Sequence, residues 1–170
     1  MAEEEAIIAF FPCVRFEVQI IMRFKGLASD QKNKSLEDKL KHSLKLHDEL
    51  SNFYSIITKL VLICLKKGLP LVIENPYSTQ HYLTRYWPIE PKIIDINRWK
   101  NGDYYEKPTQ YWFINCEPLK NLIMDEGIAI HGKKKIEKER GAMRSMISPE
   151  YARRFIRQYL KKYDESDIYK

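Results

Sequence analysis

The fold is decided by two short apolar runs, Ala6-Ile7-Ile8-Ala9-Phe10-Phe11 and Leu69-Pro70-Leu71-Val72-Ile73. Their shortness and their β-branched and aromatic content predict buried strands rather than helices. Between them, a long amphipathic helix is predicted to begin at Ser35 and to end at Gly68. Its apolar face is expected to contain Leu36, Leu40, Leu44, His47, Leu50, Tyr54, Ile57, Val61 and Cys64. A strand, a helix and a strand in this order predict a βαβ unit, in which the two strands are parallel.

Two more strands and one more helix complete the predicted fold. Residues 93–97 and 109–115 have the composition of strands, with a turn at Asn101-Gly102-Asp103 between them. A last helix is predicted from Ser148, the capping residue, with Pro149 in its first turn. Its buried face is expected to contain Ala152, Phe155, Ile156, Tyr159 and Leu160. We therefore expect one α/β domain over residues 1–170, with a short, mainly parallel sheet flanked by helices.

Composition and charge narrow the class of protein. The chain has 170 residues, of which 44% are apolar, so it can form a core and is not expected to be disordered. No apolar run approaches the roughly 18 residues of a membrane span, and the acidic start is unlike a secretory signal. The expected setting is cytoplasmic. Three widely spaced cysteines and four scattered histidines predict neither a disulfide framework nor a metal site.

The positive charge is concentrated at the carboxyl-terminal end. Residues 1–130 contain 17 basic and 17 acidic side chains, whereas residues 131–170 contain 12 basic and 6 acidic ones and so carry the whole net charge of +6. A basic segment on a neutral body favours a polyanionic partner, first of all nucleic acid. A solvated helix face explains the same charges equally well.

A thiol and a carboxylate follow the two strands of the predicted βαβ unit. Cys13 comes just after the first strand, and Glu74 comes directly after the second. Because the carboxyl ends of parallel strands lie at one edge of a sheet, we expect both side chains to face one crevice. A thiolate beside a carboxyl group is a plausible covalent catalyst. Cys13 taken alone is more simply a buried apolar residue.

The two strands and their polar ends resemble a known family. Ala9-Phe10-Phe11-Pro12-Cys13, followed by Leu71-Val72-Ile73-Glu74-Asn75-Pro76, is similar to the Pro-Cys and Glu-Asn motifs of DNA cytosine-5 methyltransferases. The similarity is closest to phage-type members, which have Glu-Asn-Pro. It extends through Lys107-Pro108-Thr109-Gln110-Tyr111-Trp112 to the helix near residue 149, and so covers the chain from residue 6 to about residue 160.

The resemblance implies a Rossmann-like methyltransferase fold and a role for each motif residue. Cys13 would attack carbon 6 of a cytosine flipped out of DNA, and Glu74 would hydrogen-bond the ring at nitrogen 3 and at the amine. The methyl group would come from S-adenosylmethionine. Pro12, Asn75 and Pro76 would shape the substrate site around them.

Further contacts to DNA are expected from polar and basic side chains later in the chain. The strand by which the family contacts the base is not evident, and Arg98, Lys107 or Gln110 could replace it. The basic face of the last helix, with Arg153, Arg154 and Arg157, would bind phosphates. DNA is therefore the expected partner.

The chain also departs from the family. The glycine-rich strand and turn that bind S-adenosylmethionine are not found in the sequence. The chain could be a truncated or split enzyme, which a homodimer or a complementing subunit would complete. It could equally be a non-catalytic module that binds nucleic acid or protein, such as a phage accessory or anti-defence protein. A third hypothesis is a cysteine hydrolase that uses His81, whereas His47 is expected in the core.

Overall fold

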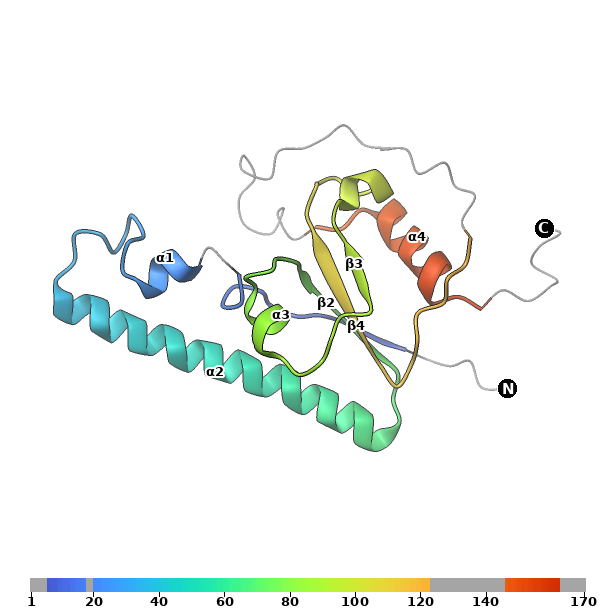
Figure 1. Ribbon diagram of the computed structural model, residues 1–170, viewed down its shortest axis with the longest axis horizontal. Coiled ribbons are helices and arrows are strands. Elements are labelled where there is room, and N and C mark those ends of the chain that lie inside the picture. Colours follow the sequence, from blue (N-terminus) through green and yellow to red (C-terminus); the bar gives the residue numbers. More distant parts are fainter. Residues whose placement is uncertain (1–5, 18–19, 123–145, 163–170) are drawn as a thin grey trace. The chain divides into compact units, whose positions relative to one another are not determined.

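The computed structural model describes residues 6–17, 20–122 and 146–162. Its elements are β1 (Ile7–Phe10), α1 (Ile20–Phe24), α2 (Leu36–Lys67), β2 (Leu71–Pro76), α3 (Tyr82–Tyr86), β3 (Ile93–Asp95), the 3-10 helix η1 (Arg98–Asn101), β4 (Thr109–Ile114) and α4 (Pro149–Tyr159) (Figure 1). The chain divides into two compact units, one of Met1–Lys92 with Gln110–Cys116 and one of Ile93–Thr109 with Glu117–Lys170.

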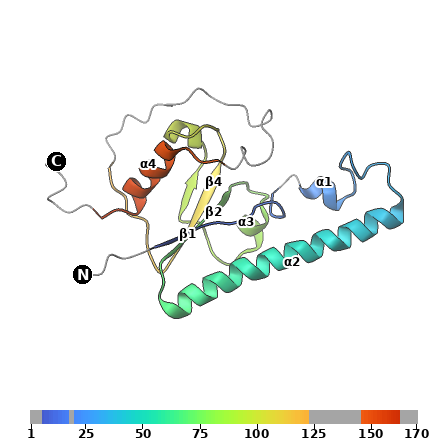
Figure 2. The same cartoon turned by 180° about the vertical axis from the view of Figure 1, so that it is seen from behind.

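The strands form an open, mixed four-stranded sheet in the order β1-β2-β4-β3, so the fold class is α/β. β1 pairs with β2 in parallel (Figure 2). Ile7 is opposite Leu71, and Phe10 is opposite Glu74. The predicted βαβ unit is therefore confirmed. The expectation of a mainly parallel sheet is corrected to a mixed one. Among the described residues, only the β1–β2 connection contains the long crossover helix that parallel neighbours usually require.

Helix α2 begins and ends where its capping residues predict. The Ser35 hydroxyl accepts a hydrogen bond from the Asp38 amide at 3.1 Å. Gly68 adopts a left-handed conformation with φ 65°, which a glycine tolerates without strain, and its amide bonds the last carbonyls of the helix. The helix buries Leu46, Leu50, Ile57, Val61 and Cys64.

The first part of α2 differs from the prediction. Leu36, Leu40 and Leu44 are 73%, 58% and 68% exposed, and His47 is exposed beside the Phe24 ring instead of lying in the core. This part of the helix runs beside α1, a helix that the sequence analysis missed, while its second part runs beside the strands (Figure 1). The apolar periodicity of α2 therefore extends along the helix beyond the side chains that neighbouring elements bury.

The core of the first unit fixes the carboxyl end of β2. Leu71 and Ile73 of β2 pack with Ile57 of α2 and Trp112 of β4 in one buried cluster. The Asn115 side chain, just after β4, donates hydrogen bonds to the carbonyls of Cys64 and Leu69. α2, β2 and β4 are thus held together at the start of β2, which leaves the opposite end of β2 to position polar groups.

The second unit contains α4 and η1. Ser148 caps α4 as predicted, because its hydroxyl accepts from the Tyr151 amide at 3.0 Å. Tyr151 and Phe155 are buried, but Ile156, expected in the core, is 43% exposed. Much of the basic segment 131–170 lies outside the described residues. None of the helices in the described ranges is both long and apolar enough to cross a membrane.

Candidate active site

Cys13 lies in a single turn that follows β1. The Cys13 carbonyl accepts hydrogen bonds from the amides of Phe16 at 2.8 Å and Glu17 at 3.2 Å. This turn brings the side chain of Glu17 back toward that of Cys13, and the thiol donates a hydrogen bond to Glu17 Oε1 at 2.9 Å. The half-buried thiol is thereby held at the carboxyl end of β1.

Glu74 lies within the next strand, β2. It is 7% exposed and pairs in register with Phe10, three residues before Cys13. Neighbouring strands of a sheet lie about 4.8 Å apart. Cys13 therefore follows β1, whereas Glu74 lies inside the adjacent parallel strand β2 and not directly after it as the sequence had indicated.

Asn75 joins the two strand ends. Its Nδ2 donates to the Phe11 carbonyl at 2.9 Å, and its Oδ1 lies 3.0 Å from His81 Nε2. Because this amide oxygen can only accept, Nε2 carries the imidazole proton and Nδ1 is unprotonated when His81 is neutral. Nδ1 is buried and has no hydrogen-bond partner among the described residues. Asn75 therefore ties the segment before Cys13 to the segment that follows β2.

Burial lowers the pKa of His81 from 6.5 to about 4. The imidazole is 1% exposed, so it is neutral at pH 7 and its charged form is disfavoured in the folded protein. The cysteine hydrolase hypothesis requires a His81–Cys13 pair. The structure instead bonds His81 to Asn75 and bonds the thiol to Glu17.

We expect stability to fall as the pH is lowered from 7 to 5, because the unfolded chain binds a proton at His81 that the folded chain does not. The pKa values of 6.5 and about 4 give a loss of about 2 kcal/mol at pH 5 from this residue. Urea denaturation at both pH values would measure it. His81→Gln should show a pH dependence smaller by this amount, and equal pH dependence of the two proteins would contradict the prediction.

Gln110 and the two prolines lie around the same strand ends. Gln110, fully buried in β4, donates from Nε2 to the Pro76 carbonyl at 2.8 Å and exchanges hydrogen bonds with Thr84. Gln110 thus fixes the chain where it leaves β2. Pro12 is exposed beside Cys13, and Pro76 is half-buried.

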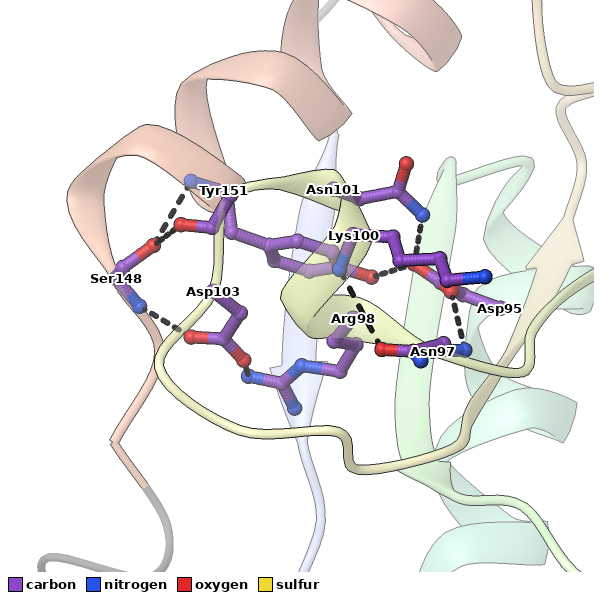
Figure 3. Close-up of polar contacts among 9 residues, drawn as sticks. Asp95, Asn97, Arg98, Lys100, Asn101, Asp103, Ser148 and Tyr151 are labelled. Atoms are coloured by element: carbon purple, nitrogen blue, oxygen red, sulfur yellow. Dashed lines mark hydrogen bonds and ion pairs between the residues drawn. The ribbon is translucent and has the colours of Figure 1, made fainter. Parts of the chain in front are cut away.

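Arg98, predicted to contact a base, has a structural role in the second unit (Figure 3). Its guanidinium is buried, forms an ion pair with Asp103, and lies 4.8 Å from the centre of the Tyr151 ring. Asp103 also accepts from the Ser148 amide at 2.9 Å. Arg98 was expected to contact a base, but in the structure its contacts are to other residues of this buried network.

The same network contains residues that the sequence analysis did not single out. Asp95 accepts from the Tyr151 hydroxyl at 3.1 Å and from Asn101 Nδ2 at 2.8 Å (Figure 3). Asp103 was read only as part of a turn. Gly102 has a φ of 93° and is the residue at which η1 ends. An acidic residue directly after such a helix-ending glycine is the sequence signal that could have singled out Asp103.

The remaining predicted DNA contacts also belong to the second unit. Arg153 and Arg157 are exposed on α4, Arg154 is half-buried, and Lys107 is half-buried before β4. In the part of the chain that the structure describes, no three His, Cys, Asp or Glu side chains are grouped to hold a metal ion.

The described residues do not fit a methyl donor of the expected kind. Such a site needs a glycine turn directly after a strand, where the backbone can approach the ligand closely. The glycines with positive φ are Gly26, Gly68 and Gly102, and each follows a helix instead. A Cβ at Gly26 would meet the Lys39 side chain at 3.0 Å, so this glycine accommodates the protein itself.

Comparisons with known proteins identify no relative. No family model, no curated protein and no solved structure matches the chain.

Proposed function

We propose that this chain carries the cytosine-attacking part of a DNA cytosine-5 methyltransferase with a Rossmann-like methyltransferase fold. The observation that supports it is the position of Cys13 just after β1 and of Glu74 within β2, the adjacent parallel strand. Asn75 strengthens this argument because it binds the Phe11 carbonyl across the two strand ends.

The reaction requires a nucleophile and a polar group on opposite sides of a pyrimidine ring. The thiolate of Cys13 adds to carbon 6 of cytosine, and the electrons of the 5,6 double bond move toward carbon 5 and the N3 side of the ring. Glu74 hydrogen-bonds N3 and the exocyclic amine and stabilises the charge that builds up there. Carbon 5 thereby becomes nucleophilic. A stacked base hides carbon 6, so the cytosine must be flipped out of the duplex.

The neighbouring residues hold these two groups in place. Asn75 and Gln110 bind main-chain carbonyls on either side of the site, at Phe11 and Pro76. Pro12 restricts the backbone just before Cys13, because its ring fixes φ. Their expected contribution is orientation of the nucleophile and of Glu74.

The DNA partner would be bound in part by α4. Arg153 and Arg157 are exposed, and guanidinium groups bind phosphates with two parallel hydrogen bonds. Arg154 and Lys107 are half-buried and are expected to contribute less.

S-adenosylmethionine supplies the methyl group in the family, but the described residues do not form its site. The proposal therefore concerns attack on the base. A complementing chain, or a site that two copies form together, would have to provide the donor site.

A second candidate function is a non-catalytic module that binds nucleic acid. The observation that favours it is the combination of exposed arginines on α4 with glycine turns that follow only helices in the described ranges. Such a module would bind DNA without reacting with it.

The test is exchange of the cytosine C5 hydrogen with solvent, which needs no methyl donor. Addition of Cys13 at carbon 6 lets carbon 5 accept a proton from water, and elimination then releases the original hydrogen and the thiolate. We expect the protein to release tritium from DNA that contains 5-tritiated cytosine. Cys13→Ser should abolish the release, and Glu74→Gln should lower it at least 100-fold, within the range of contributions from such groups.

Cys116→Ser is the matched control, because Cys116 is another half-buried cysteine and its replacement is expected to leave the exchange unchanged. DNA binding without exchange in the unaltered protein would overturn the proposal and favour the binding module. Exchange that survives in Cys13→Ser would remove Cys13 from the mechanism.

A further inference from the structure

Glu17 is a polar neighbour of the nucleophile that the proposed reaction does not use. Its Oε1 accepts a hydrogen bond from the Cys13 thiol at 2.9 Å, and both side chains are half-buried. The two residues are four apart, and the backbone turn between them closes on the Cys13 carbonyl. The contact therefore follows from the shape of the turn.

That turn is anchored on three sides. The Phe16 side chain is 1% exposed and lies against the rings of Phe11, Phe53, His81 and Tyr82. The Phe16 carbonyl accepts from the Tyr82 amide at 3.0 Å, and Arg15 forms an ion pair with Glu49 of α2. With its backbone fixed in this way, the turn keeps the thiol and the carboxylate adjacent.

A carboxylate next to a thiol favours the protonated sulfur for two reasons that act in the same direction. A negative charge at this distance opposes formation of the thiolate, and a hydrogen bond donated by S–H is lost on ionisation. The thiolate is the nucleophile, so the pair makes Cys13 less reactive.

We propose that Glu17 holds Cys13 as a protonated thiol in the free protein, so that the nucleophile forms only when a bound base breaks the Cys13–Glu17 hydrogen bond. This inference deepens the proposed function, on which the identity of the base rests. On release the thiol proton passes to water, and the sulfur electron pair forms the bond to carbon 6. Glu17 is thus a positioning residue that limits the reaction of Cys13 with groups other than the bound base.

A general base is the other role that a carboxylate could have here. Ordinary carboxyl and thiol groups have pKa values of roughly 4.3 and 8.5, so proton transfer from thiol to carboxylate is unfavourable by about four orders of magnitude. Loss of the proton to water at pH 7 is less unfavourable. The chemistry therefore favours protection of the thiol over its deprotonation by Glu17.

The test is alkylation of Cys13 by iodoacetamide, measured peptide by peptide by mass spectrometry between pH 6 and pH 9. Glu17→Gln should raise the Cys13 rate at pH 7 about 3- to 10-fold and move the midpoint of the pH profile to lower pH. The rate at Cys116 should stay unchanged. Asp48→Asn, which removes an exposed carboxylate on α2, should leave both rates as they were.

An unchanged or lower Cys13 rate in Glu17→Gln would overturn the inference, and a lower rate would indicate a general base. Cys64 is 1% exposed and reports unfolding, because it reacts only if the core opens. If it reacts in Glu17→Gln, Glu17→Asp provides the test, since its shorter side chain withdraws the carboxylate and should also raise the Cys13 rate. Absence of C5 hydrogen exchange together with faster alkylation would reject the proposed reaction but retain the effect of Glu17 on the thiol.

Discussion

Asp103→Ala is expected to lower the free energy of unfolding by about 3–5 kcal/mol, because it leaves Arg98 as a buried cation without its ion-pair partner. The side chains of Arg98 and Asp103 are 2% and 0% exposed, so solvent does not screen the loss. The substitution also removes the acceptor for the Ser148 amide at the start of α4. Urea denaturation followed by circular dichroism would measure the change.

Two variants separate the parts of this effect. Asp103→Asn keeps an oxygen acceptor for Ser148 but removes the charge, so we expect most of the loss to remain. The double variant Arg98→Met with Asp103→Leu should recover part of it, because an apolar pair of similar size needs no charge compensation. Asp48→Ala, at an exposed site on α2, should change stability by less than about 0.5 kcal/mol. A loss below about 1 kcal/mol in Asp103→Ala would contradict the structural role of the ion pair.

Asn75→Ala is expected to lower the free energy of unfolding by about 3 kcal/mol. Asn75 is fully buried, and its removal leaves the Phe11 carbonyl and the His81 Nε2 hydrogen without their partners. Each unsatisfied buried group costs about 1–3 kcal/mol. Thermal and urea denaturation would measure the loss, and the site should lose C5 exchange activity because the turn that carries Cys13 is no longer tied to β2.

A double-mutant cycle with His81→Phe checks the mechanism of this loss. If the two residues act through their hydrogen bond, the double variant should be more stable than the sum of the single losses predicts, by about 1 kcal/mol or more. Additive losses would mean that Asn75 acts through Phe11 alone.

The sequence predicted the local elements well where several signals agreed. Ser35 and Ser148 cap the helices that they were expected to cap, and the predicted strand over residues 109–115 is β4. Capping and short apolar runs act over a few residues, so the chain alone contains the information. The prediction for β2 was short, since the strand continues through Glu74 and Asn75 to Pro76.

The errors lie where a side chain's environment depends on distant segments. The periodicity of α2 identified an apolar face. It did not indicate that α1 and the strands leave Leu36, Leu40 and Leu44 on this face exposed. Arg98 was expected to contact a base, because its packing against Asp103 and the ring of Tyr151 on α4 is recognised only once the chain has folded. Glu17 is only four residues from Cys13, but no pattern in the sequence marked it as the partner of the thiol, because the turn that joins them was not predicted.

The sequence alone was sufficient to predict the βαβ unit, and with it the placement of Cys13 just after one strand and of Glu74 on the parallel strand beside it. This follows because a long helix between two short apolar runs permits few other connections. The polar groups that surround these residues depend on the tertiary structure. Asn75, His81 and Gln110 acquire their partners through main-chain carbonyls and side chains up to 64 residues away, and those contacts depend on packing that no local pattern specifies.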